Sequence, residues 1–235
     1  MIIHGRSDVG RVRTRNEDRY LVREFSAGHV LIAVMDGMGG QPSGALAAQL
    51  AHDVLAAFVP DQRPVPEQLH DLVLQANAAV ALEELSQPEL YGMGSTLTVA
   101  LINNGVLHYA HVGDSRLFHY NGASLVQVTT DHNMAQFLYE EGKLTKEEAR
   151  CSPMRNLLDQ CLGGSFMGED IASLRLSPGD RLLLCSDGIH DEITVEQITA
   201  VMSRQEGAES LCHSLVQLAL EAGGTDNITA VVLEY

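Results

Sequence analysis

The sequence contains no tryptophan, and aromatic residues make up only 5% of its 235 residues. A folded core must therefore be built mainly from Leu, Val, Ile, Ala and Met. Hydrophobic residues make up 45% of the chain and charged residues 20%, which is ordinary for a globular protein. This length favours one sizeable domain, spanning residues 1–235, over two domains.

Basic residues are scarce. The chain has 15 Lys and Arg against 31 Asp and Glu, so its formal net charge is −16. A negative field of this size repels nucleic acids and anionic membrane surfaces, and it tolerates bound cations. We therefore expect neither nucleic acid nor membrane among the partners. Most of the carboxylates need only be solvated surface groups.

Long apolar runs and metal-ligand cysteine patterns are also missing. The run at residues 30–35 is far too short to span a bilayer, and the first residues carry charge from Arg6 onward without the apolar stretch of a secretory signal. The four cysteines form no CxxC or Cys/His spacing, and no HExxH is present, which argues against a zinc site. Cys185 and Cys212 fall inside apolar segments and are expected to be buried reduced thiols, and a cytoplasmic location is expected.

The hydrophobic pattern predicts an α+β protein. Alternating or continuous apolar runs indicate strands, and Asn-Gly pairs between them indicate hairpins, so we expect an antiparallel meander in the middle of the chain. The predicted strands are 29–35, 96–102, 106–112, 116–120, 124–128, 180–185 and 228–233. The predicted helices are 43–58, 66–85, 133–141, 145–150, 195–204 and 208–222. Helices in pairs and strands in hairpins favour antiparallel sheets with helices outside.

Four aspartates occupy a recurring position next to predicted strands. Asp36, Asp114 and Asp187 follow strands closely, and Asp226 comes just before the last strand. Taken singly, each is a typical turn residue beside glycine. If the strand ends converge, however, buried carboxylates would repel one another unless a cation compensates. Several aspartate oxygens suit Mg²⁺ or Mn²⁺.

The chain resembles the metal-dependent protein phosphatases of type 2C, in their bacterial single-domain form. The resemblance rests on ordered motifs that cover nearly the whole chain: SDVG at 7–10, RTRNED at 13–18, VMDGMGG at 34–40, GST at 94–96, HVGDSR at 111–116, TDH at 130–132, CSDG at 185–188 and GTDN at 224–227. It implies an α/β/β/α sandwich of two mostly antiparallel sheets flanked by helices.

The resemblance also implies a dinuclear metal centre of Mn²⁺ or Mg²⁺. Asp36 would bridge the two ions, and the carbonyl of Gly37 would bind one of them. Asp187 and Asp226 would complete the protein ligands of the other ion. A hydroxide bridging the two ions would then attack the phosphorus of phosphoserine or phosphothreonine, without a phosphoenzyme.

Four further residues receive roles from the same resemblance. Glu17 and Asp18 would hold metal-bound waters, and Asp114 would bind a third, weaker ion together with Asp187. Arg13 would clasp the substrate phosphate, to which its planar fork is suited. Arg15 is expected to be a surface charge.

A segment at about 133–162 resembles the mobile flap that lies beside the active site in this family. Met38 stands where some members have a histidine proposed as general acid, and Gln41 stands where many bacterial members have His. His132 and His190 are expected to be solvated or hydrogen-bonded surface residues. The family implies phosphoprotein substrates, a Hanks-type Ser/Thr kinase as the opposing enzyme, and a monomer.

Two alternatives compete with this interpretation. A pseudophosphatase that only binds phosphoproteins would have lost metal ligands, whereas Asp36, Asp187 and Asp226 are all present. An aspartate-nucleophile protein, such as a haloacid-dehalogenase-like phosphatase or a response-regulator receiver, would need a parallel βαβ sheet. The hairpin signals and the GTDN motif oppose that second alternative.

Overall fold

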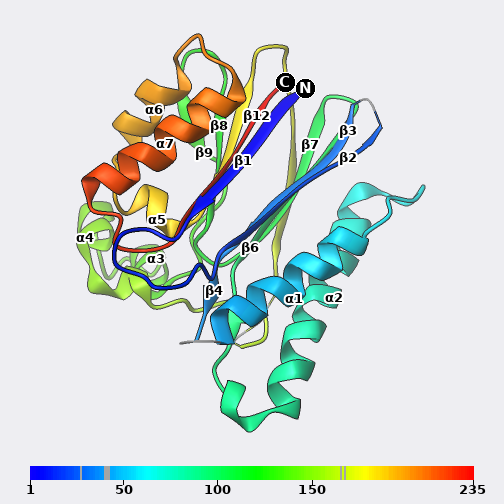
Figure 1. The fold of residues 1–235 in the computed structure, drawn as a ribbon, viewed down its shortest axis with the longest axis vertical. Coiled ribbons are helices and arrows are strands. Elements are labelled where there is room, and N and C mark those ends of the chain that lie inside the picture. The colour runs from blue at the N-terminus through cyan, green and yellow to red at the C-terminus, as the bar shows by residue number, and fades with distance from the viewer. Residues whose placement is uncertain (27, 40–42, 165, 167) are drawn as a thin grey trace.

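The computed structural model describes residues 1–26, 28–39, 43–164, 166 and 168–235. Two antiparallel sheets pack face to face, and helices cover their outer faces (Figure 1). The first sheet has the order β1 (Ile2–Asp8), β12 (Ile228–Glu234), β11 (Arg181–Cys185), β8 (Arg116–Tyr120) and β9 (Leu125–Gln127). The second has the order β10 (Asp170–Arg175), β7 (Val106–Val112), β6 (Leu97–Asn103), β3 (His29–Met35) and β2 (Arg19–Ser26).

The helices complete four layers. Helices α1 (Ser43–Ala57) and α2 (Val65–Ser86) cover the second sheet, and α6 (Val195–Met202) and α7 (Ala208–Ala222) cover the first. The predicted α/β/β/α sandwich is confirmed. Every pair of neighbouring strands in the described residues is antiparallel, which excludes the parallel βαβ sheet of the aspartate-nucleophile alternative.

Strand β3 shows why the apolar run is continuous. Leu31, Ala33 and Met35 pack against α1 and α2, whereas Ile32 and Val34 face the first sheet across the sandwich. Both faces of the strand are therefore buried, and no position is left for a polar residue.

Both predicted hairpins are present, but the predicted meander is wrong. Asn104 and Gly105 have φ angles of 49° and 79°, as a tight hairpin turn between β6 and β7 requires. Strands β8 and β9 form the second hairpin, in the other sheet. The chain therefore does not continue from β7 to a neighbouring strand but crosses the sandwich at 113–115.

The edges of the sheets contain the strands that the pattern did not predict. These are β1, β2 and β10, which each lie at the edge of a sheet and are at most half-buried along most of their length. Their side chains mix polar and apolar residues without a clear alternation, so the strand signal is weak. A short pair, β4 (Gly37–Met38) with β5 (Gly94–Ser95), was also not predicted.

Helix ends follow the capping residues in the sequence. Pro66 lies in the first turn of α2, and Thr145 forms a capping box with Glu148 at the start of α4 (Lys146–Cys151). Ser43 is the first residue of α1, and its hydroxyl donates to the carbonyl of Gly39. Gly40 and Gln41 lie outside the described residues.

The segment 133–162 forms a small helical lobe outside the sandwich, beside the short helix α5 (Asp187–His190) (Figure 1). It contains α3 (Met134–Glu140), α4 and the 3-10 turn η2 (Pro153–Asn156). A bridge between Asn133 and Leu158 closes its base. The predicted helices are confirmed, and the motion of this flap stays a prediction.

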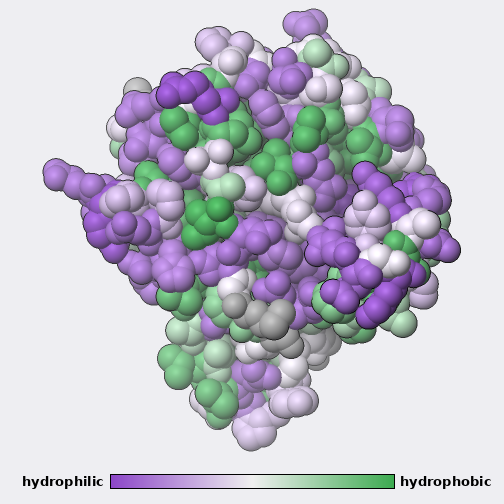
Figure 2. Space-filling view, turned by 180° about the vertical axis from the view of Figure 1, so that it is seen from behind, coloured by the Kyte–Doolittle hydropathy of each residue, from purple (hydrophilic) through white to green (hydrophobic). Residues whose placement is uncertain are grey.

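The surface is predominantly hydrophilic, with apolar residues in separate groups (Figure 2). Exposed large side chains include Leu82 and Leu85, near the end of α2, and Tyr91, just after the turn η1 (Pro88–Leu90). Among the described helices, none offers an apolar stretch long enough to cross a membrane.

Candidate metal centre

The fold brings the four predicted aspartates to one end of the sandwich. Asp36 follows β3 directly, and its backbone is held by Thr96, whose hydroxyl accepts from Asp36 N–H at 3.0 Å. Asp187 begins α5 just after β11, and Asp226 precedes β12. The charges of Asp114, Asp187 and Asp226 all act on the carboxyl group of Asp36. The sequence-separated strand ends therefore do converge.

Asp18 joins this cluster from the loop before β2. Its side chain is buried, with only 2% of the residue exposed, and Ser186 donates its hydroxyl to Oδ2 at 2.8 Å. Oδ1 has no hydrogen-bond partner among the described residues, and the same holds for the buried Oε1 of Glu17. Buried acceptor atoms without a donor are costly, so each of these oxygens requires a ligand.

The electrostatics of the cluster are unfavourable in the absence of a cation. Burial, followed by repulsion from Asp226, raises the pKa of Asp187 to about 7, and burial raises that of Asp18 to about 6. Burial and neighbouring carboxylates also hold the pKa values of Asp36 and Asp114 well above their usual range. These side chains cannot all ionise together unless positive charge is supplied.

The donor set fits hard divalent cations. A Cβ placed on Gly44 would lie 2.7 Å from the carbonyl oxygen of Gly37 and 3.0 Å from Oε2 of Glu17, so two oxygens face the same small space. Oxygen-only surroundings of this kind suit Mg²⁺ or Mn²⁺. Within the described ranges, no three His, Cys, Asp or Glu side chains are already arranged as metal ligands.

Among the described residues, Arg13 is the only positively charged side chain that forms a hydrogen bond with an aspartate of this cluster. Its Nη2 donates to Oδ2 of Asp226 at 2.7 Å, and 47% of its side chain is exposed. Arg13, the predicted phosphate-binding residue, is therefore paired with Asp226, a predicted metal ligand. Arg15 is exposed, as expected.

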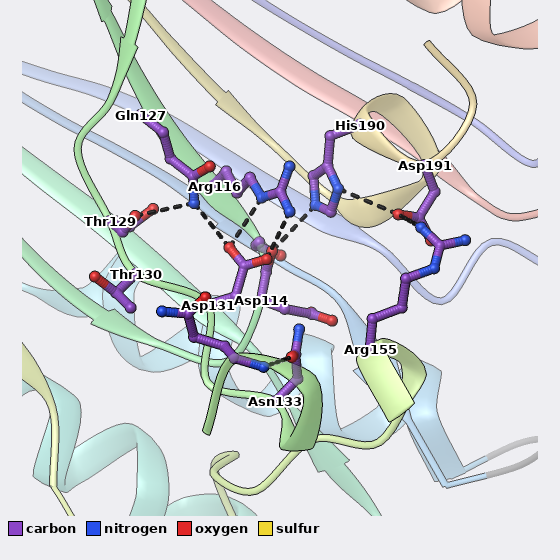
Figure 3. A network of polar contacts seen from close by, with 12 residues as sticks. Asp114, Arg116, Gln127, Thr129, Thr130, Asp131, Asn133, Arg155, His190 and Asp191 are labelled. Carbon is purple, nitrogen blue, oxygen red and sulfur yellow. Dashed lines mark hydrogen bonds and ion pairs between the residues drawn. The ribbon is translucent and has the colours of Figure 1, made fainter. Parts of the chain in front are cut away.

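Asp114 lies at the crossing between the sheets, surrounded by charges that the sequence did not reveal (Figure 3). Asp187, Asp131 and Asp191 all act on its carboxyl group. Arg116 donates to both oxygens of Asp131, at 2.9 and 2.6 Å. Predicted partners Asp114 and Asp187 are thus brought together, with an unpredicted Arg116–Asp131 pair beside them.

The two histidines near the motifs are not surface residues, so that prediction is wrong. The imidazole of His190 is only 3% exposed, and its Nε2 donates to the carbonyl oxygen of Asp114 at 3.1 Å. His132 is likewise buried. Arg155 of the flap forms an ion pair with Asp191, which joins the flap to the residue next to His190 (Figure 3).

The sequence profile of the protein phosphatase 2C family matches residues 7–220. The chain belongs to this family. It is 40% identical over 232 residues to the serine/threonine protein phosphatase PstP of Mycobacterium tuberculosis, covering 97% of this chain and 44% of that protein. The chain therefore spans less than half the length of this relative.

A relative of similar length and several solved structures extend the family likeness. Protein phosphatase PhpP of Streptococcus pneumoniae is 34% identical over 235 residues, covering 97% of this chain and 94% of the relative. The catalytic domain of PstP in complex with two manganese ions superposes with a TM-score of 0.87 at 35% identity, covering 98% and 96% of the two chains. Stp1 of Staphylococcus aureus gives a TM-score of 0.92 at 28% identity, covering 100% and 95%.

Proposed function

We propose that this protein is a metal-dependent protein serine/threonine phosphatase that uses Mn²⁺ or Mg²⁺. The observation that carries the proposal is the cluster of Asp18, Asp36, Asp187 and Asp226 at one end of the sandwich. Burial and neighbouring carboxylates raise the pKa values of Asp18, Asp36 and Asp187, so the cluster lacks compensating positive charge. The manganese complex of the PstP catalytic domain supports the choice of metal. When bound, two cations would supply an activated water and neutralise charge on a phosphoryl group.

The residues of the chain would then have separate roles in binding the cations, orienting water and binding the phosphate. Asp36 would bridge the two cations, with Asp187 and Asp226 on one of them and the Gly37 carbonyl on the other. Asp18 and Glu17 would orient bound water through their unpartnered oxygens. Arg13 would exchange its contact with Asp226 for the substrate phosphate once a cation neutralises that carboxylate.

Replacing Asp36 by Asn tests this proposal. The change removes the charge asked to bridge both cations, so turnover of a phosphothreonine peptide with Mn²⁺ should fall at least about 100-fold. EDTA should abolish wild-type activity. Asp53→Asn, at an exposed position on α1, is the control and should remain active. Unchanged turnover in Asp36→Asn would contradict the dinuclear assignment, and peptide binding without hydrolysis by the wild type would favour the pseudophosphatase alternative.

Asp114 is proposed to bind a third and weaker cation with Asp187. Few protein oxygens and many waters make such a site weak, because Mn²⁺ and Mg²⁺ give up hydration reluctantly. Asp114→Ala should lower kcat severalfold or more and shift the Mn²⁺ dependence, with a nearly unchanged melting temperature. A lower melting temperature with an unchanged Mn²⁺ titration would indicate a turn residue instead.

The wider role is proposed on the same basis. Substrates would be phosphorylated proteins, and the opposing enzyme a Ser/Thr protein kinase, acting with this monomeric protein in the cytoplasm. The serine/threonine specificity in the relatives' names and the net charge of −16, which disfavours nucleic acid and membrane, support this role. Phosphoproteomes compared with and without the enzyme would identify its substrates.

A further inference from the structure

Asp114 lies in the segment 113–115 that joins the two sheets, and the position of its carboxylate depends on how this segment is held. The chain crosses from β7 to β8 at residues 113–115, where burial, followed by repulsion from Asp187, raises the pKa of the Asp114 carboxyl group. In the described part of the chain, no hydrogen bond reaches that carboxylate. Its position must therefore be fixed through the backbone on either side.

His132 holds the residue before Asp114 at two points. Its backbone N–H donates to the carbonyl oxygen of Gly113 at 2.8 Å, and Gly113 N–H donates to the imidazole Nδ1 at 3.3 Å. On the other side of the segment, a Cβ on Gly113 would lie 2.6 Å from the Thr96 methyl group, and the φ of Gly113 is 102°. Gly113 is thus confined between Thr96, which precedes β6, and His132.

The imidazole of His132 is itself oriented by its neighbours. Because Nδ1 accepts from a backbone N–H, Nε2 carries the ring proton and donates to Oδ2 of Asp170 at 3.2 Å. The ring also packs against His111, with 4.8 Å between centroids. His111 in turn donates from Nε2 to the carbonyl oxygen of Thr130 at 2.9 Å. A buried polar chain therefore runs from the surface carboxylate of Asp170 to the Gly113 amide.

We infer that His132 is a positioning residue, which holds the Gly113–Asp114 segment so that the Asp114 carboxylate can share a cation with Asp187. This inference rests on the proposed function. His132 touches neither substrate nor the two inner cations in this scheme, so its loss should weaken the third site without emptying the others.

The first test measures the metal-free protein. Amide hydrogen exchange at Gly113 should become about five- to tenfold faster in His132→Ala, because one buried hydrogen bond is lost. His132→Asn should stay near the wild-type rate, because its side-chain oxygen can occupy the place of Nδ1. His132→Gln, whose amide reaches the place of Nε2, should behave like His132→Ala. His119→Asn is the matched control, since His119 makes a comparable contact with Asp180 at 2.9 Å at the distal end of β8.

The second test is calorimetric titration with Mn²⁺ alone. His132→Ala should retain the two tight binding events and weaken the weakest by about tenfold or more, and His132→Asn should restore it. Unchanged Gly113 exchange, or equal weakening of all Mn²⁺ binding, would overturn the inference. If His132→Ala does not fold, the contrast between His132→Asn and His132→Gln decides the same question. Should the wild type prove inactive on phosphopeptides, the proposed function would fail, while exchange and calorimetry would still decide the role of His132.

Discussion

Arg13 contacts the Asp226 carboxylate, and in the proposed mechanism it would release this partner to bind the substrate phosphate. Since a charge-assisted fork to phosphate would be lost, Arg13→Ala should raise KM for a phosphopeptide about tenfold or more and lower kcat/KM. Arg15→Ala removes an exposed charge from the same loop and should change KM by about twofold at most. Steady-state kinetics of the two variants check this, and equal effects would refute the assignment of Arg13.

His111 should make stability depend on pH. Burial lowers its pKa to about 4, so between pH 6.5 and 4 the unfolded chain binds a proton that the folded chain does not. The free energy of unfolding should therefore fall as the pH drops through this window, by roughly 3 kcal/mol at its lower end.

Comparison with His111→Gln isolates this effect. The raised pKa values of the aspartates act in the opposite direction, but they are present in both proteins and cancel in the difference. Urea unfolding at several pH values provides the measurement. Parallel pH dependences of the two proteins would show that His111 does not titrate as the structure requires.

Among individual residues, the sequence predicted those that are marked by their immediate neighbours in the chain. Asp36, Asp114 and Asp187 could be found because each follows an apolar strand beside glycine. The pairing of Arg116 with Asp131 and the contact of Arg155 with Asp191 could not be found, because each joins residues far apart in the chain. The burial of His132 and His190 also gave no signal, since a single polar residue leaves no periodic pattern.

The ion pair between Arg155 and Asp191 should control how often the flap opens. Arg155→Ala removes the ion pair with Asp191, a partly buried contact worth on the order of 1 kcal/mol, so the flap should open more often. Limited proteolysis should then cleave within 133–162 several times faster. Arg150→Ala removes an exposed ion pair with Glu147 inside the same segment and should leave the rate unchanged. Equal cleavage rates for both variants would argue against a docked flap.

Interior elements were predictable and edge elements were not. Strand β3 matches its predicted range because burial on both faces leaves only apolar residues at 30–35. Strand β7 matches because the Asn104-Gly105 turn sets its start, and α7 matches because its apolar residues recur on one face. Strands β1 and β10 were missed because an edge strand retains polar side chains on its exposed parts. The meander was wrong because sequence spacing cannot distinguish a hairpin from a crossing between sheets.

The molecule as a whole should unfold in one step. Apolar residues from both sheets form a single buried layer between them, including Ile32 and Val34 opposite Leu184 and Val231. Circular dichroism and fluorescence of the six tyrosines should therefore give coincident urea transitions, as the predicted single domain requires. Mn²⁺ at about 100 times its Kd should stabilise the protein by about 2.7 kcal/mol and shift both signals together. Two separated transitions would contradict a single domain.

Strand β12 lies between β1 and β11, although it follows every other described strand in the chain. During synthesis, β1 stays unpaired until residues 228–234 have left the ribosome, because residues 2–8 pair with this distant segment. Asp226 emerges at the same late stage. A nascent chain can form the layer of α1 and α2 early, but the metal centre cannot assemble before Asp226 and β12 have emerged. Any phosphatase activity should therefore begin only once translation of β12 is complete.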